Sequence, residues 1–256
     1  MPMNQPYPLF EKISIECNSF CNRSCSFCTR TYDKREKTRM PTELVHKVLN
    51  ELAQVDFKGL ISFHFYNEVF TDNRIFSFYA KCKELGLRNY IFTNGDFLTL
   101  ENIELLSNFN IDEFVVSLYD WSTEEEYEEK KNYFITEFKL DTYSWNLIFV
   151  KGGEDFGNRA GYVKHRVEDL SLPINASCSK IETKMDIRYD GTVVMCCLDY
   201  FGIHKIGNIS TENVIDIWYS QLRKMQIEEL RKGNRKKFKL CSGCSDYIIP
   251  VTDNEL

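Results

Sequence analysis

Three cysteines near the start of the chain have the spacing of a metal or cluster site. Cys21, Cys25 and Cys28 form a C-x3-C-x2-C pattern directly after an expected strand at residues 12–16. Three neighbouring thiolates can bind three irons of a cubane 4Fe–4S cluster and leave the fourth iron for another ligand. A structural zinc site usually has four protein ligands, and Cys17, within or at the end of that stiff strand, is poorly placed to be the fourth.

A second group of four cysteines lies in the last third of the chain, and two of them form a C-x2-C pair. Together they could donate four thiolates to one closed site, and zinc matches this ligand count as well as a cluster does. Cys197 adjoins the group and is either a core thiol or a residue that faces the active site. The four members of the group are Cys178, Cys196, Cys241 and Cys244.

Composition and charge restrict the class of protein. The formal net charge of the 256 residues is −6, which disfavours a nucleic-acid partner, because proteins that grip phosphates usually have excess Lys and Arg. The sequence has neither an apolar run long enough to span a bilayer nor a signal-peptide pattern. We therefore expect a cytoplasmic protein with no membrane partner, in which clustered cysteines bind metal. The isolated Cys82, like Cys17, is expected to be an ordinary buried thiol.

Strand-like and helix-like segments alternate over the first two thirds of the chain. The expected strands are residues 12–16, 60–66, 90–93, 113–118 and 143–150, and the expected helices are 42–55, 73–85, 100–108 and 123–138, with Ser122 as the N-cap of the last. Such alternation predicts parallel βαβ units with right-handed crossovers. Five units are legible and a sixth strand is expected before residue 178, so the fold class is α/β, a partial barrel of about six parallel strands.

The pattern changes after about Pro173. Residues 184–189 and 192–195 flank Asp190-Gly191, a strong two-residue hairpin signal. Residues 213–232 then form one long helix or two shorter ones. We therefore expect two domains, a partial barrel at residues 1–172 and a small α+β domain at residues 173–256 that is built around the second cysteine group.

The first cysteine motif, with the aromatic Phe27 before its last cysteine, resembles the signature of the radical S-adenosylmethionine (SAM) superfamily. In that family, the open iron binds the amino and carboxylate groups of SAM, and an electron from the cluster cleaves SAM to a 5′-deoxyadenosyl radical. The resemblance implies that the three cysteines hold a 4Fe–4S cluster and that SAM is the cofactor. It also implies an external one-electron donor such as flavodoxin or ferredoxin.

Further motifs of this family follow the expected strands. Glu68, preceded by Asn67 where the family usually has glycine, matches the carboxylate that contacts the amino group of SAM. Thr93 and Asn94 resemble the turn near the adenosyl group, and Ser117 is a further residue on the cofactor side. All of them lie at carboxyl ends of strands, where parallel α/β barrels build active sites. Taken singly, each could also be an ordinary turn or surface residue.

The region from residue 178 to residue 244 resembles the auxiliary-cluster domain called twitch, a shortened SPASM domain. The resemblance covers the hairpin, a Gly-Asn-Ile segment at residues 207–209 and Asp-Ile-Trp at residues 216–218. It implies that the second cysteine group holds another 4Fe–4S cluster, and it favours iron–sulfur over zinc.

A closer resemblance is to the twitch-bearing dehydrogenases of 2-deoxy-scyllo-inosamine, carried by residues 61–66 and 93–98 and by Asn158-Arg159. In that family, a radical forms at a hydroxyl-bearing carbon, the hydroxyl loses its proton, and the auxiliary cluster takes an electron to leave a ketone. The resemblance implies that Arg159 contacts the substrate, whereas a surface arginine is the alternative. His64 and Tyr66 share one face of their strand by alternation and could point toward the substrate or belong to the core.

We therefore expect a radical SAM dehydrogenase that oxidises an alcohol of a small polyol, cyclitol or sugar. One alternative is a redox-neutral epimerase, which would need a hydrogen donor such as Cys197. A peptide-modifying enzyme is a second alternative, and a zinc-binding module without catalysis is a third.

Overall fold

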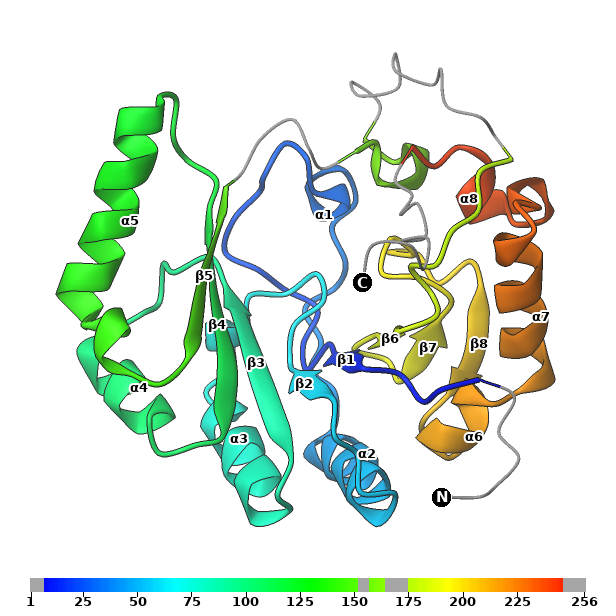
Figure 1. Cartoon of the computed structure of the whole chain (residues 1–256), viewed down its shortest axis with the longest axis horizontal. Coiled ribbons are helices and arrows are strands. Elements are labelled where there is room, and N and C mark those ends of the chain that lie inside the picture. The colour runs from blue at the N-terminus through cyan, green and yellow to red at the C-terminus, as the bar shows by residue number, and fades with distance from the viewer. Residues whose placement is uncertain (1–6, 152–156, 164–174, 246–256) are drawn as a thin grey trace, which may run out of the picture.

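A computed structural model describes residues 7–151, 157–163 and 175–245 of the chain. Within them, eight strands form one open sheet with the order β5-β4-β3-β2-β1-β6-β7-β8 (Figure 1). The strands are β1 Lys12–Ile15, β2 Leu60–Ser62, β3 Arg88–Thr93, β4 Ile111–Leu118, β5 Asn146–Lys151, β6 Lys184–Ile187, β7 Thr192–Val194 and β8 Lys205–Asn208.

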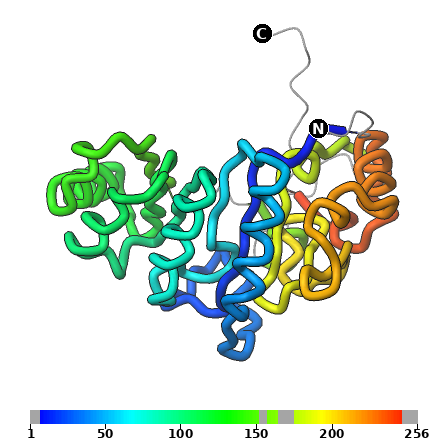
Figure 2. The backbone as a smooth tube through the Cα atoms, turned by 90° about the horizontal axis from the view of Figure 1, so that it is seen from below, coloured from blue at the N-terminus to red at the C-terminus, as the bar shows by residue number. Residues whose placement is uncertain are grey.

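Helices connect the parallel strands and cover the outer side of the sheet, where α2 to α5 lie, while α6 and α7 lie beside β8 (Figure 1). Figure 2 shows α2 near the middle of the molecule, with the segments of β4 to β5 and of α7 on opposite sides of it. The helices are α1 Thr29–Tyr32, α2 Thr42–Gln54, α3 Ile75–Glu84, α4 Leu100–Leu106, α5 Glu124–Phe138, α6 Val214–Trp218, α7 Gln221–Arg231 and α8 Lys239–Ser242. In the described part of the chain, no helix combines the length and apolarity needed to cross a membrane.

The expected α/β fold with a partial barrel is confirmed, but its sixth parallel strand is β6. This strand pairs in parallel with β1, on the side opposite to β2, and then turns through the hairpin into antiparallel β7. The position before residue 178 that was expected for the sixth strand lies largely outside the described residues, and in the described part of the chain the first strand of the hairpin pairs with the free edge of β1. The expected domain boundary at residues 172 and 173 lies outside the described residues.

Hydrogen bonds between side chains and the backbone explain two differences from the expected boundaries and decide one alternative that the sequence left open. Strand β2 ends at Ser62 instead of residue 66, since the N–H of Phe65 donates to Asn67 Oδ1 (2.8 Å) and that of Tyr66 donates to Glu16 Oε1 (3.2 Å). The N-cap of α5 is Thr123 and not Ser122, because Thr123 and Glu126 form a capping box. Residues 213–232 form two helices, since the Ser220 side chain caps α7.

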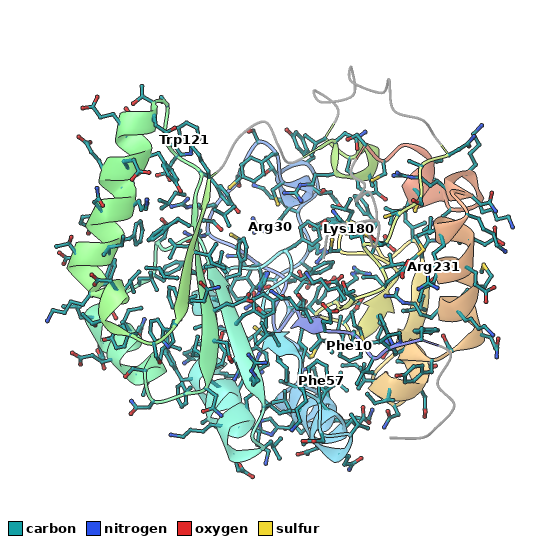
Figure 3. The ribbon with its side chains drawn as sticks, in the orientation of Figure 1. Phe10, Arg30, Phe57, Trp121, Lys180 and Arg231 are labelled. Atoms are coloured by element: carbon teal, nitrogen blue, oxygen red, sulfur yellow. The ribbon has the colours of Figure 1, made fainter. Side chains whose placement is uncertain are left out.

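The core lies between the sheet and the helices. Helix α2 buries Val45, Val48 and Leu52 against the sheet. Phe10 and Phe57 pack below β1, with ring centroids 5.0 Å apart (Figure 3). The same core continues without a break to buried side chains of β6, β7 and α6, so the packing of the two expected domains is shared.

Arg223 of α7 holds the hairpin strands to the helix. Its guanidinium is fully buried and donates to the carbonyls of Met195 (2.7 Å), Lys184 (2.9 Å) and Ile181, and it lies 4.5 Å from the ring of Trp218. Burial lowers the pKa of Arg223 to about 10, which leaves it charged at neutral pH. A buried cation with three carbonyl partners is expensive to remove, because each carbonyl would lose its donor.

Arg223→Leu should therefore lower the free energy of unfolding by about 3 kcal/mol. For a chain of this size the melting temperature should fall by about 6–12 °C. Arg231→Leu is the matched control on the same helix, because the Arg231 side chain is 56% exposed and pairs with Glu182 at the surface (Figure 3). Its effect should stay below about 1 kcal/mol. Equal losses in the two variants, measured by thermal melting, would contradict the role of Arg223.

Candidate active site

A cavity of about 290 Å³ opens at the carboxyl ends of the first four strands and reaches down to the start of β6. The loop that follows β1 forms its rim, and residues after β2, β3 and β4 form its wall. The lining residues are Cys21, Arg23, Cys25, Phe27, Cys28, His64, Phe65, Tyr66, Asn67, Glu68, Phe92, Asn94, Ser117, Tyr119, Arg159, Lys184 and Cys197.

Cys21, Cys25 and Cys28 come together at the rim. The N–H of Cys28 donates to the carbonyl of Cys25 (3.0 Å), and Thr31 Oγ1 caps the same carbonyl (2.6 Å), so the loop is folded on itself. Burial, together with the neighbouring Cys28 and Cys21 thiols, raises the pKa of Cys25 to about 11. Three thiols that oppose one another's ionisation become thiolates together only when a cationic group binds them.

The donor set at the rim fits an iron–sulfur cluster. Cys21, Cys25 and Cys28 line one cavity, and a cubane binds each thiolate through a different iron. Three thiolates would leave the fourth iron open to another ligand.

Glu68 joins the ends of β2 and β3. Its buried carboxylate accepts hydrogen bonds from Thr93 Oγ1 (2.6 Å) and from the N–H of Asn94 (2.8 Å). Burial raises the pKa of Glu68, and these two donors act in the opposite direction. Asn94 continues the link to the rim, because its Nδ2 donates to Asn22 Oδ1 (2.9 Å). Glu68 and Asn94 line the cavity, whereas Thr93 lies behind Glu68 and positions it.

Asn67 stands where the resembling family has glycine, and its side chain folds back on its own segment. Oδ1 accepts from the N–H of Phe65 (2.8 Å), and Nδ2 donates to the carbonyl of Phe63 (3.1 Å). The Asn67 amide thus forms its hydrogen bonds within the loop. The Glu68 carboxylate next to it lines the cavity. The departure from glycine is thus accommodated locally.

Phe27 and Ser117 meet at Tyr119, on the side of the cavity formed by β4. The rings of Phe27 and Tyr119 pack edge to face, with centroids 4.8 Å apart. Burial raises the pKa of Tyr119. Phe27 and Ser117, two of the residues that were expected on the cofactor side, line the cavity together with Tyr119.

The floor of the cavity carries polar groups from both halves of the sheet. His64 stacks on Phe92 with ring centroids 4.8 Å apart, and its Nδ1 contacts the Ser62 hydroxyl. Tyr66 donates to the carbonyl of Cys197 (3.0 Å), which joins the segment after β2 to the segment after β7. His64 and Tyr66 therefore face the same cavity, although they lie beyond the end of β2 and Phe65 between them lines it too, so strand alternation is not the reason.

Arg159 reaches the cavity from a strained turn. It has a φ of 49° and the next residue, Ala160, a φ of 57°, both in the left-handed region that non-glycine residues rarely adopt. Burial raises the pKa of Cys28 and of Tyr66, and the positive charge of the Arg159 guanidinium partly opposes both rises. The guanidinium therefore lies near both groups. Its Nε donates to the carbonyl of Phe27 (3.3 Å).

Asn158 fixes this turn to the C-terminal cysteine segment. Its buried side chain donates to the carbonyl of Gly243 (2.7 Å) and accepts from the N–H groups of Ser245 (3.0 Å) and Gly161 (3.2 Å). The backbone that carries Arg159 is thus tied directly to the segment that carries Cys241.

The second cysteine group lines a separate, narrow cavity. Burial raises the pKa of Cys241 to about 12, with Cys244 adding to the rise. Arg235 and Lys180 stand beside the thiols, and Arg235 donates to the carbonyl of Cys244 (2.9 Å). Two cations are well placed to balance thiolate charge. The thiols that line this cavity are Cys178, Cys196, Cys241 and Cys244.

Cys196 and Cys197 are neighbours in the chain, but they face different cavities. Cys196 lines the narrow cavity with the other auxiliary thiols, while Cys197 lines the main one. A hydrogen bond from the Cys196 side chain lowers the pKa of Cys197. The two remaining cysteines, Cys17 and Cys82, line neither cavity and are fully buried, in agreement with their expected place in the core.

Two family models match the chain. The model of the radical SAM superfamily matches residues 15–139, and that of an iron–sulfur cluster-binding domain, SPASM, matches residues 178–245. The chain therefore contains a radical SAM domain followed by a SPASM domain. As a radical SAM enzyme it uses S-adenosylmethionine and iron–sulfur clusters, so the expected cofactors are confirmed, and a zinc-binding module without catalysis is disfavoured.

Individual relatives agree with this assignment. An S-adenosyl-L-methionine-dependent 2-deoxy-scyllo-inosamine dehydrogenase from Niallia circulans is 28% identical over 252 residues, which are 96% of each chain. The crystal structure of BtrN in complex with AdoMet and 2-DOIA superimposes with a TM-score of 0.80 at 27% identity, over 95% of this chain and 96% of that chain. SuiB of Streptococcus suis bound to S-adenosylmethionine has a TM-score of 0.59 at 16% identity, over 93% and 76% of the two chains, and shows the fold alone.

The sequence analysis missed three residues that shape this radical SAM site. Arg23 pairs with Asp96 and so ties the cysteine rim to the turn after β3. Tyr119 forms one wall, and Lys184 forms part of the floor. The sequence could have indicated that Lys184 faces the same side as Asp186. These two polar residues alternate with apolar residues along β6 and so share one strand face.

His64 gives a pH test of the cavity floor. Burial, with help from Lys184, lowers its pKa well below the usual value near 6.5. Below about pH 6.5 the unfolded chain binds a proton that folded His64 does not, so stability is lost as the pH falls. Relative to His64→Phe, which keeps the aromatic stack but cannot titrate, the wild type should lose up to about 1.4 kcal/mol per pH unit below 6.5. Thermal melting of both proteins between pH 7.5 and 5.5 measures this difference, and parallel curves would contradict it.

Proposed function

We propose that this radical SAM enzyme oxidises one alcohol of a small polyhydroxylated substrate, a cyclitol, polyol or sugar, to a ketone. In this proposal an auxiliary cluster accepts the second electron. The name of the relative from Niallia circulans, a dehydrogenase of an amino cyclitol, supports it over 96% of each chain. The structure of BtrN, whose title includes AdoMet and 2-DOIA, supports it at a TM-score of 0.80.

The observation that carries the proposal is the division of Cys196 and Cys197 between two cavities. A substrate on the floor of the main cavity would lie one peptide unit from a ligand of the auxiliary cluster. Tyr66 holds that peptide, because its hydroxyl donates to the carbonyl of Cys197 (3.0 Å). Removal of an electron from a substrate radical requires an acceptor at short range, and this arrangement supplies one.

We assign the cofactor ligands from the two groups of thiols. Cys21, Cys25 and Cys28 would hold the cluster that binds SAM, and the second cysteine group would hold the auxiliary 4Fe–4S cluster. On the SAM side the assigned residues are Phe27, Glu68, Thr93, Asn94 and Ser117. The corresponding domains would be residues 1–172 and 173–256.

The oxidation removes one hydrogen atom, one proton and one electron from the alcohol. When bound, SAM and the two clusters together supply the hydrogen-atom acceptor and the electron acceptor. The chain must then orient the carbon and manage the hydroxyl proton. Arg159 is suited to hold the hydroxyl, since a guanidinium donates hydrogen bonds to oxygen and stabilises an alkoxide electrostatically.

The proposal also includes an external donor and a compartment. Reductive cleavage of SAM consumes one electron, which a flavodoxin or ferredoxin would supply to the cluster held by the rim cysteines. These cysteines are partly exposed, so a donor protein can approach them. All ten cysteines are free thiols, which suits a reducing compartment such as the cytoplasm.

A redox-neutral reaction such as epimerisation is the second candidate, and the position of Cys197 favours it. A thiol on the wall of the main cavity could return a hydrogen atom to a substrate radical. The two candidates differ in whether that thiol is needed, so a variant of this residue separates them.

Iron content tests the cluster assignment. Anaerobically reconstituted wild type should contain about eight irons per chain, and the Cys21/Cys25/Cys28→Ala variant about four. Cys241→Ala with Cys244→Ala should also fall to about four, while SAM binding is kept. A wild type that held about four irons together with zinc would remove the internal electron acceptor and overturn the dehydrogenase proposal.

Cys197→Ala tests the direction of the chemistry. If the enzyme is a dehydrogenase, the variant should keep turnover within about threefold of wild type, because no thiol takes part in the step. Product analysis in deuterated water gives the second readout, since an exchangeable thiol would deliver deuterium to the product carbon. Loss of turnover in the variant, together with one carbon-bound deuterium in the wild-type product, would establish the redox-neutral reaction instead.

A further inference from the structure

A lysine lies on the floor of the main cavity, where the proposed substrate would bind. Lys184 is the first residue of β6, and its side chain lines the cavity together with His64, Tyr66 and Cys197. The SAM-side groups Glu68 and Asn94 lie after the carboxyl ends of β2 and β3, so Lys184 is at the opposite end of the cavity.

Asp186 holds this lysine in its charged form. The two residues share a face of β6, and Lys184 Nζ lies 3.2 Å from Asp186 Oδ1. Burial opposes the charge of Lys184, but Asp186 and Tyr90 outweigh it and raise the pKa of the ammonium. Asp186 is 2% exposed and does not line the cavity, so the pair presents its ammonium, and not its carboxylate, to a ligand.

Two of the cavity neighbours of Lys184, His64 and Tyr66, carry no charge, and Cys197, whose pKa is lowered, is the neighbour that can carry negative charge. His64 is kept neutral, since burial lowers its pKa well below the usual value. Tyr66 is also neutral, because burial raises its pKa. Among the described residues that line the cavity, the carboxylate is that of Glu68, which is held by Thr93 and Asn94 at the far end.

We propose that Lys184 determines specificity by donating a hydrogen bond to a substrate hydroxyl and excluding a substrate with an ammonium group at that position. An ammonium N–H donor needs an acceptor, which a hydroxyl oxygen provides and a protonated amine does not. Two cations at contact distance in a cavity also repel strongly. The substrate class is therefore a neutral polyol or cyclitol, in contrast to the amino cyclitol in the name of the Niallia circulans relative. The inference rests on the proposed function for the place of the substrate.

The test compares ligands that differ in a single group. Reconstituted enzyme with SAM bound is titrated by calorimetry with scyllo-inositol and with scyllo-inosamine, and then with glucose and glucosamine. In each pair the wild type should bind the hydroxyl compound at least about tenfold more tightly than the amine. Equal or tighter binding of the amines by the wild type would overturn the proposal.

A double variant that removes both charges of the Lys184–Asp186 pair reduces the risk that the protein misfolds. Lys184→Met with Asp186→Asn removes both charges, so no buried carboxylate is left without its partner. The preference for hydroxyl over amine should fall at least about tenfold in this variant. Lys205→Met, which replaces an exposed lysine at the start of β8, is the control and should keep the wild-type preference. An unchanged preference in the double variant would show that other groups set the specificity.

The formation of 5′-deoxyadenosine and of ketone separates this inference from the proposed function. If the binding preference depends on Lys184 but the bound polyol yields no ketone, the dehydrogenase proposal fails while the recognition role of Lys184 stands. If ketone forms equally from polyol and amine in wild type and double variant, the oxidation stands and the role of Lys184 fails.

Discussion

One buried carboxylate holds together the segments that surround the active site. Glu16, directly after β1, is fully buried and pairs with Arg35 (2.8 Å), which lies beyond the cysteine rim. The same carboxylate accepts from the N–H of Tyr66 after β2 and from that of Tyr189 after β6, each at 3.2 Å. Arg35 lies 3.6 Å from the ring centroid of Tyr200, close in sequence to the auxiliary cysteines. Because a buried charge is tolerated only when it is fully paired, these contacts constrain four segments at once.

This constraint explains how one continuous sheet can serve two groups of thiols. Strand β1 is paired in parallel on both sides, so the rim cysteines after β1 and the hairpin that starts at β6 share one framework. Cys196 and Cys197 follow that hairpin and divide between the two cavities. SuiB has the same fold at 16% identity, which shows that the framework is common to distant enzymes. The fold alone therefore does not specify a substrate, and in our proposal the side chains of the cavity floor do so.

Much of the fold could be predicted because its signals are local. Apolar periodicity placed the helices, and Asp190-Gly191 placed the hairpin, since Gly191 has a φ of 79° that glycine adopts without strain. The partner of that hairpin could not be predicted, because pairing between β1 and β6 joins residues about 170 positions apart and leaves no local pattern. The end of β2 was also missed, since it depends on the distant carboxylate of Glu16.

The sequence by itself determined the chemistry of this protein. Cys21, Cys25 and Cys28 lie so close along the chain that any fold places them in one loop, and the radical SAM match that spans them supports our assignment of their thiols to a cluster. Only the tertiary structure decided what the substrate meets, because the cavity floor is assembled from strands distant in sequence. Lys184 is an ordinary charged residue in the sequence, and it becomes a recognition group because β6 lies beside β1 and turns its ammonium inward. Ligands that lie close together along the chain can be predicted from the sequence. Residues that determine substrate specificity come together through long-range contacts, so only the tertiary structure reveals them.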